Sequence, residues 1–379
     1  MMVNAENFGS FFVKVRHEKR RSFVEGKTAM KISPLFAALC AVACAGTAPA
    51  LAQNIAPAGS FPLAAKVGVD SRADKVAPPG SINRGPFNMN SWKFGPAFDT
   101  PANTPLWNPV KVKMRQGGKI TSVTVMGNAD PDVYCAAANS GVDFVWTEMQ
   151  HSAGTWDSVE KMWNRCPSTK GVPGARIPSA NQIDEQHALD LGAMVLVVPT
   201  VRSVAEAREA VKWAYYPPMG GRSSGNMTAA YSKVPGGYRN TFNNNLVLIA
   251  MIETLDGLRD ADKIAALSGI DAVFAASGDL GNFTGYKQGT PDYERAINIV
   301  HDAALRAGKY LCGPWFWLNR PDFKCFQGHG GDKLTTPGPG LQAAFVEAQK
   351  QEFGPLWNTP GHVTEGPFAS TQAPKPHGK

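Results

Sequence analysis

At 379 residues the chain is long enough for one large domain or two ordinary ones, and its 43% hydrophobic and 18% charged content is that of a globular protein. The formal net charge of +7 is unevenly spread, because residues 1–52 carry +4 of it and residues 53–379 only +3. So small a charge over most of the chain excludes a nucleic-acid-binding footprint.

The first 52 residues have the pattern of an export signal. A basic stretch from Lys14 to Lys31 precedes the apolar run Leu35–Cys44, and Ala50-Leu51-Ala52 forms an A-x-A cleavage site. The apolar run is too short to span a membrane, so no span is expected in the mature form. Arg20-Arg21 resembles a twin-arginine signal, and both the Sec and the twin-arginine routes stay open. We expect a periplasmic or secreted protein.

Removal of the signal leaves four cysteines, Cys135, Cys166, Cys312 and Cys325. None of them forms a C-x-x-C metal or redox motif. In an oxidising compartment they could form two disulfides, with three possible pairings, or remain as buried thiols, and the sequence does not choose.

The rest of the chain divides into three segments by composition. Residues 53–106 are rich in Pro, Gly, Ala and Asn and predict an irregular arm. Its aromatic residues favour an arm that lies against the domain; they are Phe87, Trp92, Phe94 and Phe98. Residues 107–354 form the main domain, and residues 355–379 a loose tail.

In the main domain short apolar runs alternate with helical patterns, the clearest being Ser203–Trp213 and Pro291–Ala307. The predicted strands are, in chain order, Ile120–Met126, Val142–Glu148, Val172–Ile177, Ala193–Pro199, Leu246–Glu253, Asp271–Ala275, Lys309–Cys312 and Asp332–Thr335. Eight alternating units predict an α/β fold, the closed (β/α)8 or TIM barrel. An open doubly wound sheet is the alternative, but the first strand is followed by Gly127-Asn-Ala-Asp130 rather than a glycine-rich phosphate loop.

Two carboxylates follow neighbouring predicted strands. Glu253 ends the fifth strand, and Asp279 comes shortly after the sixth. Adjacent strands lie about 4.8 Å apart, so both side chains could reach one cation. Carboxylates without a nearby Cys or His suit Mg²⁺, Mn²⁺ or Co²⁺. The alternative is that each acid caps the helix that follows it.

Three further polar residues are predicted at the same mouth of the barrel. His151 is a candidate general base, and Glu148, three residues earlier, could orient its ring. Arg176 ends the third strand, where it could pair with Glu148 or stabilise negative charge on a substrate. His187 and His301 fall in helical patterns and are interpreted as surface residues.

Several of these segments resemble those of the HpcH/HpaI aldolase family. Phe144–His151 resembles its histidine-bearing second strand, Ala175–Pro178 its arginine strand and Tyr215–Gly220 its loop after the fourth helix. Ile252–Thr254 and Ser277–Leu280 match its two metal-ligand segments. The resemblance runs from about residue 107 to 312 and fades beyond.

The resemblance implies a (β/α)8 barrel that performs class II aldol chemistry on a small-molecule substrate, through a metal-stabilised enolate. It makes Glu253 and Asp279 the metal ligands, Arg176 the oxyanion stabiliser and His151 part of the acid–base machinery. Backbone N–H groups near Ser277, Gly278 and Asp279 would hold the substrate carboxylate. A homo-oligomer is also implied, built through the C-terminal helices, where this chain diverges.

The chain departs from the family at three positions near this site. The family usually has Asp at the position of Glu148, Glu at that of Gln150 and Gln at that of Met251. Gln150 and Met251 are predicted to contact the substrate, and they make its surroundings less polar. The sequence therefore predicts lyase chemistry on a changed substrate.

The predicted function is metal-dependent carbon–carbon cleavage of a hydroxylated oxo-acid, or of a bulkier substrate with an aromatic group. The second possibility is suggested by apolar residues in the sequence: Met149, Met251, Trp156, Trp315 and Trp317. The alternative function is a secreted metal-containing binding protein that kept the aldolase barrel and lost turnover. Retention of His151 and Arg176 beside both carboxylates favours the enzyme.

Overall fold

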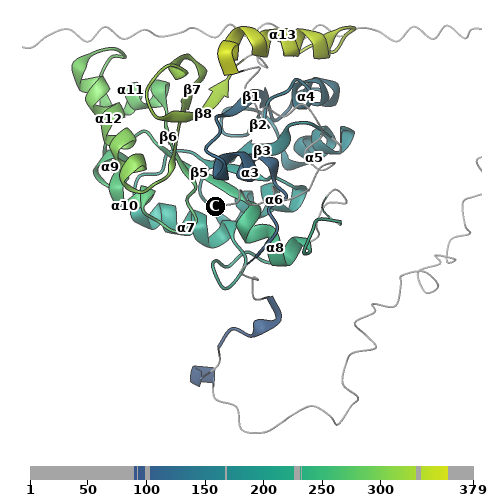
Figure 1. Ribbon diagram of the computed structural model, residues 1–379, viewed down its shortest axis with the longest axis vertical. Coiled ribbons are helices and arrows are strands. Elements are labelled where there is room, and N and C mark those ends of the chain that lie inside the picture. The colour runs from purple at the N-terminus through teal and green to yellow at the C-terminus, as the bar shows by residue number, and fades with distance from the viewer. Residues whose placement is uncertain are drawn as a thin grey trace, which may run out of the picture. The chain divides into compact units, whose positions relative to one another are not determined.

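The computed structural model describes residues 89–91, 93–98, 103–166, 169–225, 231, 233–329 and 334–356. The chain divides into two units, residues 1–90 and 91–379. In the second unit eight parallel strands close into a barrel in chain order, with the helices outside it (Figure 1). This confirms the predicted (β/α)8 barrel. The export signal predicted for residues 1–52 lies outside the described residues.

Seven of the eight strands form where the apolar runs predict them. They are β1 (Ile120–Met126), β2 (Phe144–Glu148), β3 (Val172–Arg176), β4 (Val195–Val198), β5 (Val247–Ile252), β6 (Ala272–Ala275) and β7 (Tyr310–Pro314). The eighth prediction, Asp332–Thr335, is wrong, because β8 is Phe323–Gly328. Only residues 315–322, with the short 3-10 helix η6 (Trp315–Trp317), join β7 to β8. Parallel strands are usually joined by a crossover of about a dozen residues or more. The predicted eighth strand was therefore placed too far along the chain, after the true one.

Ten α-helices follow the first strand among the described residues, and several of them begin at a side chain that caps the helix. They are α4 (Pro131–Ala138), α5 (Trp156–Arg165), α6 (Gln182–Leu191), α7 (Val204–Ala214), α8 (Tyr238–Asn245), α9 (Leu255–Arg259), α10 (Ala261–Ala265), α11 (Ser277–Thr284), α12 (Pro291–Arg306) and α13 (Leu341–Phe353). Thr155 and Ser158 form a capping box on α5, and Ser203 caps α7. The helices predicted at Ser203–Trp213 and Pro291–Ala307 are confirmed as α7 and α12.

Side chains of the strands alternate between the barrel interior and the helical layer. On β2, Trp146 packs inside the barrel, with its ring centroid 5.5 Å from that of Phe274 on β6. Thr147, the next residue, faces outward and accepts a hydrogen bond from the indole of Trp163 on α5 at 3.1 Å. The period of two therefore places Glu148, two residues after Trp146, inside the barrel at the carboxyl end of β2.

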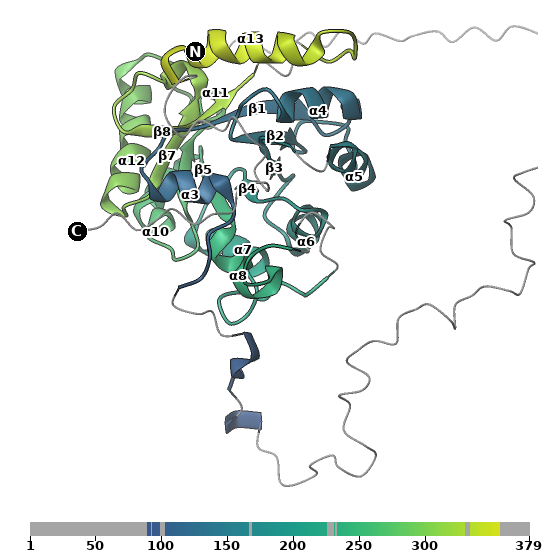
Figure 2. The ribbon, with the colours of Figure 1, turned by 45° about the vertical axis from the view of Figure 1, so that its right-hand side comes forward.

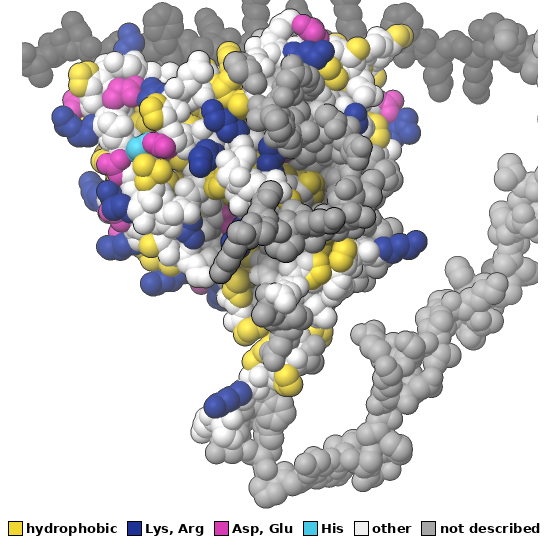
Figure 3. All heavy atoms as spheres, in the orientation of Figure 1, with side chains coloured by type: hydrophobic (Ala, Val, Ile, Leu, Met, Phe, Trp, Pro, Cys, Tyr) yellow, Lys and Arg dark blue, Asp and Glu magenta, His cyan; other side chains and the backbone are white. Residues whose placement is uncertain are grey.

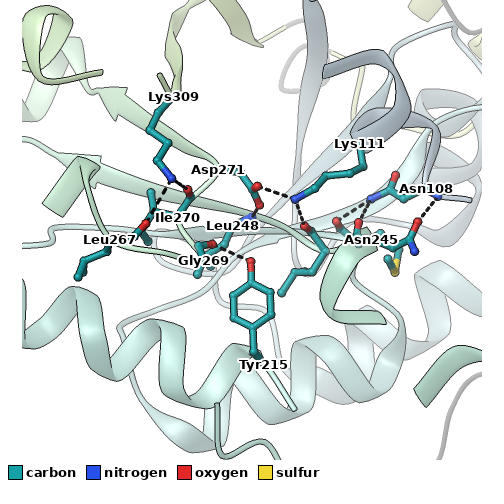
Figure 4. A network of polar contacts seen from close by, with 12 residues as sticks. Asn108, Lys111, Tyr215, Asn245, Leu248, Leu267, Gly269, Ile270, Asp271 and Lys309 are labelled. Carbon is teal, nitrogen blue, oxygen red and sulfur yellow. Dashed lines mark hydrogen bonds and ion pairs between the residues drawn. The ribbon is translucent and has the colours of Figure 1, made fainter. Parts of the chain in front are cut away.

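The amino-terminal end of the barrel is closed by α3 (Pro109–Arg115), which lies across the strands (Figure 2). Its Lys113 ammonium donates to both oxygens of Asp143, at 2.9 and 3.0 Å. Lys111 pairs with Asp271 and donates to the Leu246 carbonyl, in a polar network that also contains Asn108 and Asn245 (Figure 4). This end of the barrel is a closed floor.

The sequence left open whether Cys135, Cys166, Cys312 and Cys325 form two disulfides or remain thiols, and the structure contains two disulfides. Cys135 on α4 pairs with Cys166 at the end of α5, and Cys312 on β7 pairs with Cys325 on β8. The second pair joins residues that already face each other in the sheet register. One disulfide therefore links two helices, and the other links two neighbouring strands.

Of the arm aromatics, Phe87 and Trp92 lie outside the residues whose surroundings are described. Phe94 and Phe98 are 48% and 42% exposed. Phe98 still contacts Arg239 of α8, whose guanidinium lies 4.3 Å from the ring centroid. A guanidinium can stack on an aromatic face while the ring's other face remains in water.

Basic and acidic side chains are interspersed on the face drawn in Figure 3. His301 illustrates this mixture, because its half-buried ring lies between Asp302 and Asp322. Among the described residues no helix has the length and apolar character needed to cross a membrane.

Candidate active site

The carboxyl ends of β2 and β3 are joined by a buried ion pair between Glu148 and Arg176. The two residues are register partners in the sheet. Oε2 of Glu148 accepts hydrogen bonds from Nε of Arg176 at 2.6 Å and from the Trp146 indole at 3.2 Å. Both ions are almost fully buried, and a charge in such a place requires a partner. The pairing was one of two roles that the sequence left open for Arg176.

The other oxygen of Glu148 holds the loop that carries His151. Oε1 accepts from the backbone N–H groups of Gln150 at 2.8 Å and His151 at 3.0 Å. The predicted contact of Glu148 with the imidazole is therefore replaced by a contact with the backbone. The ring of His151 is exposed at the barrel mouth, as expected for a group that meets a substrate. Glu148 therefore fixes the position of the loop through the loop's own backbone.

Arg176 keeps part of its guanidinium available on the interior side. Its Nη1 lies 4.0 Å from the sulfur of Met251, which is a weak acceptor, and its guanidinium carbon lies 5.6 Å from the centroid of the Trp146 ring. Met251 is 1% exposed. The sequence predicted that Met251 contacts the substrate. In the structure its side chain lies beneath the site, against Arg176, and not on an open surface.

Glu253 immediately follows β5 and is fully buried. Oε1 accepts a hydrogen bond from the backbone N–H of Thr200 at 2.7 Å, whereas Oε2 is buried and has no hydrogen-bond partner among the residues that the structure describes. Burial, and next the nearby negative charge of Asp279, raise the pKa of Glu253. A buried carboxylate oxygen without a donor is costly, and a bound cation would relieve that cost.

Asp279 lies in the first turn of α11 and is half-buried. The carbonyl of Ser277, at the start of the same helix, accepts hydrogen bonds from the Tyr293 hydroxyl at 2.8 Å and from the Gln288 amide at 3.1 Å. A side chain added at Gly278 would meet no atom within 4 Å. The first turn of α11 is therefore anchored on one side and open on the other.

Neither acid caps the helix that follows it, so that alternative is wrong. The cap of α9 is Thr254, whose hydroxyl accepts from the N–H of Gly257, and the cap position of α11 is Ala276, which has no side-chain acceptor. Because Ala276 cannot cap, the first N–H groups of α11 receive no side-chain acceptor from that position. They are suitable donors for an anionic group at this end of the barrel.

Glu253 and Asp279 together fit a divalent cation with open coordination positions. Their oxygens suit Mg²⁺, Mn²⁺ or Co²⁺, and the partnerless Oε2 of Glu253 is a free ligand atom. No group of three or more His, Cys, Asp or Glu arranged for a metal occurs among the described residues. Two protein ligands would leave the remaining positions to water and substrate.

A cavity of about 290 Å³ opens beside this site. It is lined by Gln150, Pro178, Ser179, Ala180, Pro199, Thr200, Arg202 and Glu206. Gln150 is one of the residues that line this cavity, and among the described residues its Oε1 is buried without a partner. Thr200 was missed, because its contact with Glu253 is made by a backbone N–H, which no sequence pattern reveals.

A closed parallel barrel with buried acids at its carboxyl-terminal mouth defines the class, since (β/α)8 enzymes carry their active sites at that end. Residues 122–313, more than half of the chain, match the family model "HpcH/HpaI aldolase/citrate lyase", and the chain belongs to this family. The match ends close to residue 312, where the sequence resemblance fades.

Relatives and solved structures agree with this assignment. A hydroxypyruvate/pyruvate aldolase of Pseudomonas aeruginosa is 32% identical over 209 residues, which are 53% of this chain and 76% of the relative. A 2-keto-3-deoxy-L-rhamnonate aldolase of Klebsiella pneumoniae is 31% identical over 178 residues, 46% of this chain and 66% of the relative. An HpcH/HpaI family protein of Burkholderia cenocepacia has the same fold, with a TM-score of 0.54 at 22% identity, covering 64% of this chain and 99% of that one. The chain is therefore a class II aldolase, a carbon–carbon lyase.

Proposed function

We propose that the protein cleaves a hydroxylated 2-oxo acid by a metal-dependent retro-aldol reaction at the mouth formed by β2, β3, β5 and β6. The observation that carries the proposal is the buried, partnerless Oε2 of Glu253, with Asp279 as a second carboxylate nearby. The named aldolase relatives, which act on hydroxypyruvate, pyruvate and keto-deoxy sugar acids, support this substrate class.

The reaction requires one proton removal and one site for negative charge. A proton leaves the substrate hydroxyl, the carbon–carbon bond beside that carbon breaks to give an aldehyde, and the electron pair passes to the 2-oxo group. A proton then returns to the new carbanionic carbon to give a pyruvate-type product. A divalent cation bound by Glu253 and Asp279 would supply positive charge for the enolate.

The residues of the chain supply the other parts of this reaction. His151, exposed at the mouth, takes the proton from the hydroxyl. Arg176, held in place by Glu148, provides charge for the developing oxyanion. The N–H groups at the open first turn of α11, near Gly278, hold the substrate carboxylate.

The structure favours a hydroxylated oxo-acid over a substrate with an aromatic group. Of the apolar residues that suggested the larger substrate, Met149, Met251 and Trp317 are 6%, 1% and 5% exposed and belong to the core. Trp156 is half-buried, and its indole donates to Asp184 at 3.2 Å. The cavity instead offers polar groups, among them the free Oε1 of Gln150.

The test uses the half-reaction that needs no aldehyde. Pyruvate is incubated with the protein and Mn²⁺ in heavy water, and incorporation of deuterium into its methyl group is followed by mass spectrometry. We expect exchange that stops when a chelator is added and resumes when Mn²⁺ is restored. Tight Mn²⁺ binding without exchange, and without pyruvate release from 4-hydroxy-2-oxo acids, would instead support the binding protein without turnover.

We also propose that the protein is exported and assembles as a homo-oligomer. The signal pattern of residues 1–52 and the two disulfides support an oxidising compartment. Amino-terminal sequencing of the native protein should find a start near Gln53, and intact-mass measurement should find no free thiol among the remaining four cysteines. A mature chain that starts at Met1 would contradict export by cleavage, and light scattering gives the oligomeric state.

A further inference from the structure

Thr200, which lies just beyond β4, has a backbone conformation that its side chain disfavours. Its φ is +52°, and among the described residues the other non-glycine residue with positive φ is Asp322. For a β-branched residue this left-handed region is sterically unfavourable. Such strain persists only where the surroundings enforce it, and it often occurs at functional sites.

The strained conformation has a specific result at the proposed metal site. It directs the N–H of Thr200 to Oε1 of Glu253 at 2.7 Å, and the next N–H, that of Val201, bonds to the carbonyl of Met251 at 3.0 Å. The two bonds connect the end of β4 to the end of β5. With Oε1 held in this way, the partnerless Oε2 is the oxygen of Glu253 left for a ligand.

The side chain of Thr200 contacts two groups, and one of them is Glu253, whose pKa its hydroxyl lowers together with the backbone N–H. Its hydroxyl accepts a long hydrogen bond, 3.4 Å, from the amide of Gln150, and both residues line the 290 Å³ cavity. Thr200 therefore contacts the β2 loop through its side chain, and Glu253 through both its backbone N–H and its hydroxyl. It thus connects the wall of the cavity to the carboxylate of Glu253.

We propose that Thr200 is a positioning residue for Glu253, whose backbone N–H holds Oε1 so that Oε2 is presented to the cation. The inference rests on the proposed role of Glu253 as a metal ligand. Groups that orient a metal ligand through hydrogen bonds commonly change metal affinity by about 10–100-fold when removed. Loss of this one N–H should therefore weaken metal binding without removing any ligand.

The experiment measures Mn²⁺ affinity by calorimetry, without substrate, on the full-length protein. Thr200 is replaced by its α-hydroxy acid analogue, which turns the amide into an ester and removes the N–H while keeping the side chain. We expect the Kd for Mn²⁺ to rise roughly tenfold or more. The matched control is the same exchange at Val201, which removes the neighbouring hydrogen bond to Met251 and should leave the Kd within about twofold of wild type. Thermal unfolding shows that both proteins are folded.

A conservative variant separates positioning from general damage. Thr200→Ser keeps both the N–H and the hydroxyl and removes only the β-branch that disfavours positive φ, so Mn²⁺ affinity should remain within about threefold of wild type. Equal Mn²⁺ affinity of the Thr200 ester and the wild type would overturn the role of Thr200 alone. If the wild type itself binds no Mn²⁺, the metal site fails, and the role of Thr200 fails with it.

Discussion

Each end of the barrel contains a buried carboxylate, but the two carboxylates differ in how completely they are hydrogen-bonded. At the floor, Asp143 is fully buried, and its oxygens accept from Lys113 and from the N–H and hydroxyl of Thr121. At the mouth, Glu253 is as deeply buried, yet one of its oxygens has no partner. A charge whose hydrogen bonds are satisfied holds the structure together, whereas the unsatisfied carboxylate oxygen at the mouth is available to a ligand.

The difference follows from the chain direction. Asp143 precedes β2 and meets α3, which covers the floor, so its partners are supplied by the fold itself. Glu253 follows β5 at the end where (β/α)8 enzymes place their substrates. Asymmetry in hydrogen bonding therefore identifies the functional end of the barrel, and variants at each end should affect different properties.

The largest effect is expected for Arg176→Ala, because this mouth residue serves both chemistry and packing. Its loss removes charge for the oxyanion and leaves Glu148 buried without its ion-pair partner. We expect kcat to fall by about 10²–10³ and stability to fall by about 3–5 kcal/mol. Steady-state kinetics and urea unfolding measure the two losses. A kcat within threefold of wild type would remove Arg176 from the reaction.

His151→Ala should separate chemistry from stability. The ring is exposed, so its removal should lower kcat by about 10²–10⁴ with no measurable loss of stability. The pH–rate profile should also lose its acidic limb. The control is His187→Ala, which removes an exposed histidine from α6. Near-normal kcat and an unchanged acidic limb in the His151 variant would assign the proton transfer to another group.

Lys113→Met at the floor should have the opposite profile. It leaves Asp143 buried without its ion-pair partner, which should cost about 3–5 kcal/mol of stability. The kcat of the molecules that remain folded should not change, because the floor contacts no substrate. Urea unfolding and active-site-normalised kinetics test both statements. A selective loss of kcat would show that the two ends are coupled.

Glu185 on α6 is a third buried acid, and it has no proposed role in the reaction. Within the described part of the chain both of its oxygens lack hydrogen bonds, and burial, with smaller effects of Glu209 and Asp184, raises its pKa to about 9. The folded protein thus holds a proton that the unfolded chain releases near pH 4.5, so stability should fall as pH rises from 4.5 to 9. Relative to Glu185→Gln, the loss between pH 4.5 and 7 should be about 3 kcal/mol.

Urea unfolding at several pH values measures this difference. Exposed Glu160, exchanged for Gln, is the matched control and should leave the pH dependence unchanged. Parallel stability curves for the wild type and Glu185→Gln would show that Glu185 is not the source of the slope.

Patterns in the sequence predicted the barrel because seven of its strands are apolar runs that lie between helical patterns. They failed at β8, where a short connection replaces the expected crossover helix. At the site, the sequence identified the side chains that end the strands, including the pairing of Glu148 with Arg176 as one possibility. It could not predict contacts made by backbone groups, such as those of His151 with Glu148 and of Thr200 with Glu253. These depend on loop conformations that are set by the whole fold.

The most direct test of the central claim is Mn²⁺ titration of Glu253→Gln and Asp279→Asn, with lyase activity and thermal unfolding measured on the same samples. Asp256→Asn, an exposed acid in the first turn of α9, is the control. We predict that both mouth variants remain folded, bind no Mn²⁺ and have no activity, while the control resembles the wild type. Full activity of either mouth variant, or of wild type stripped of metal by a chelator, would contradict the claim.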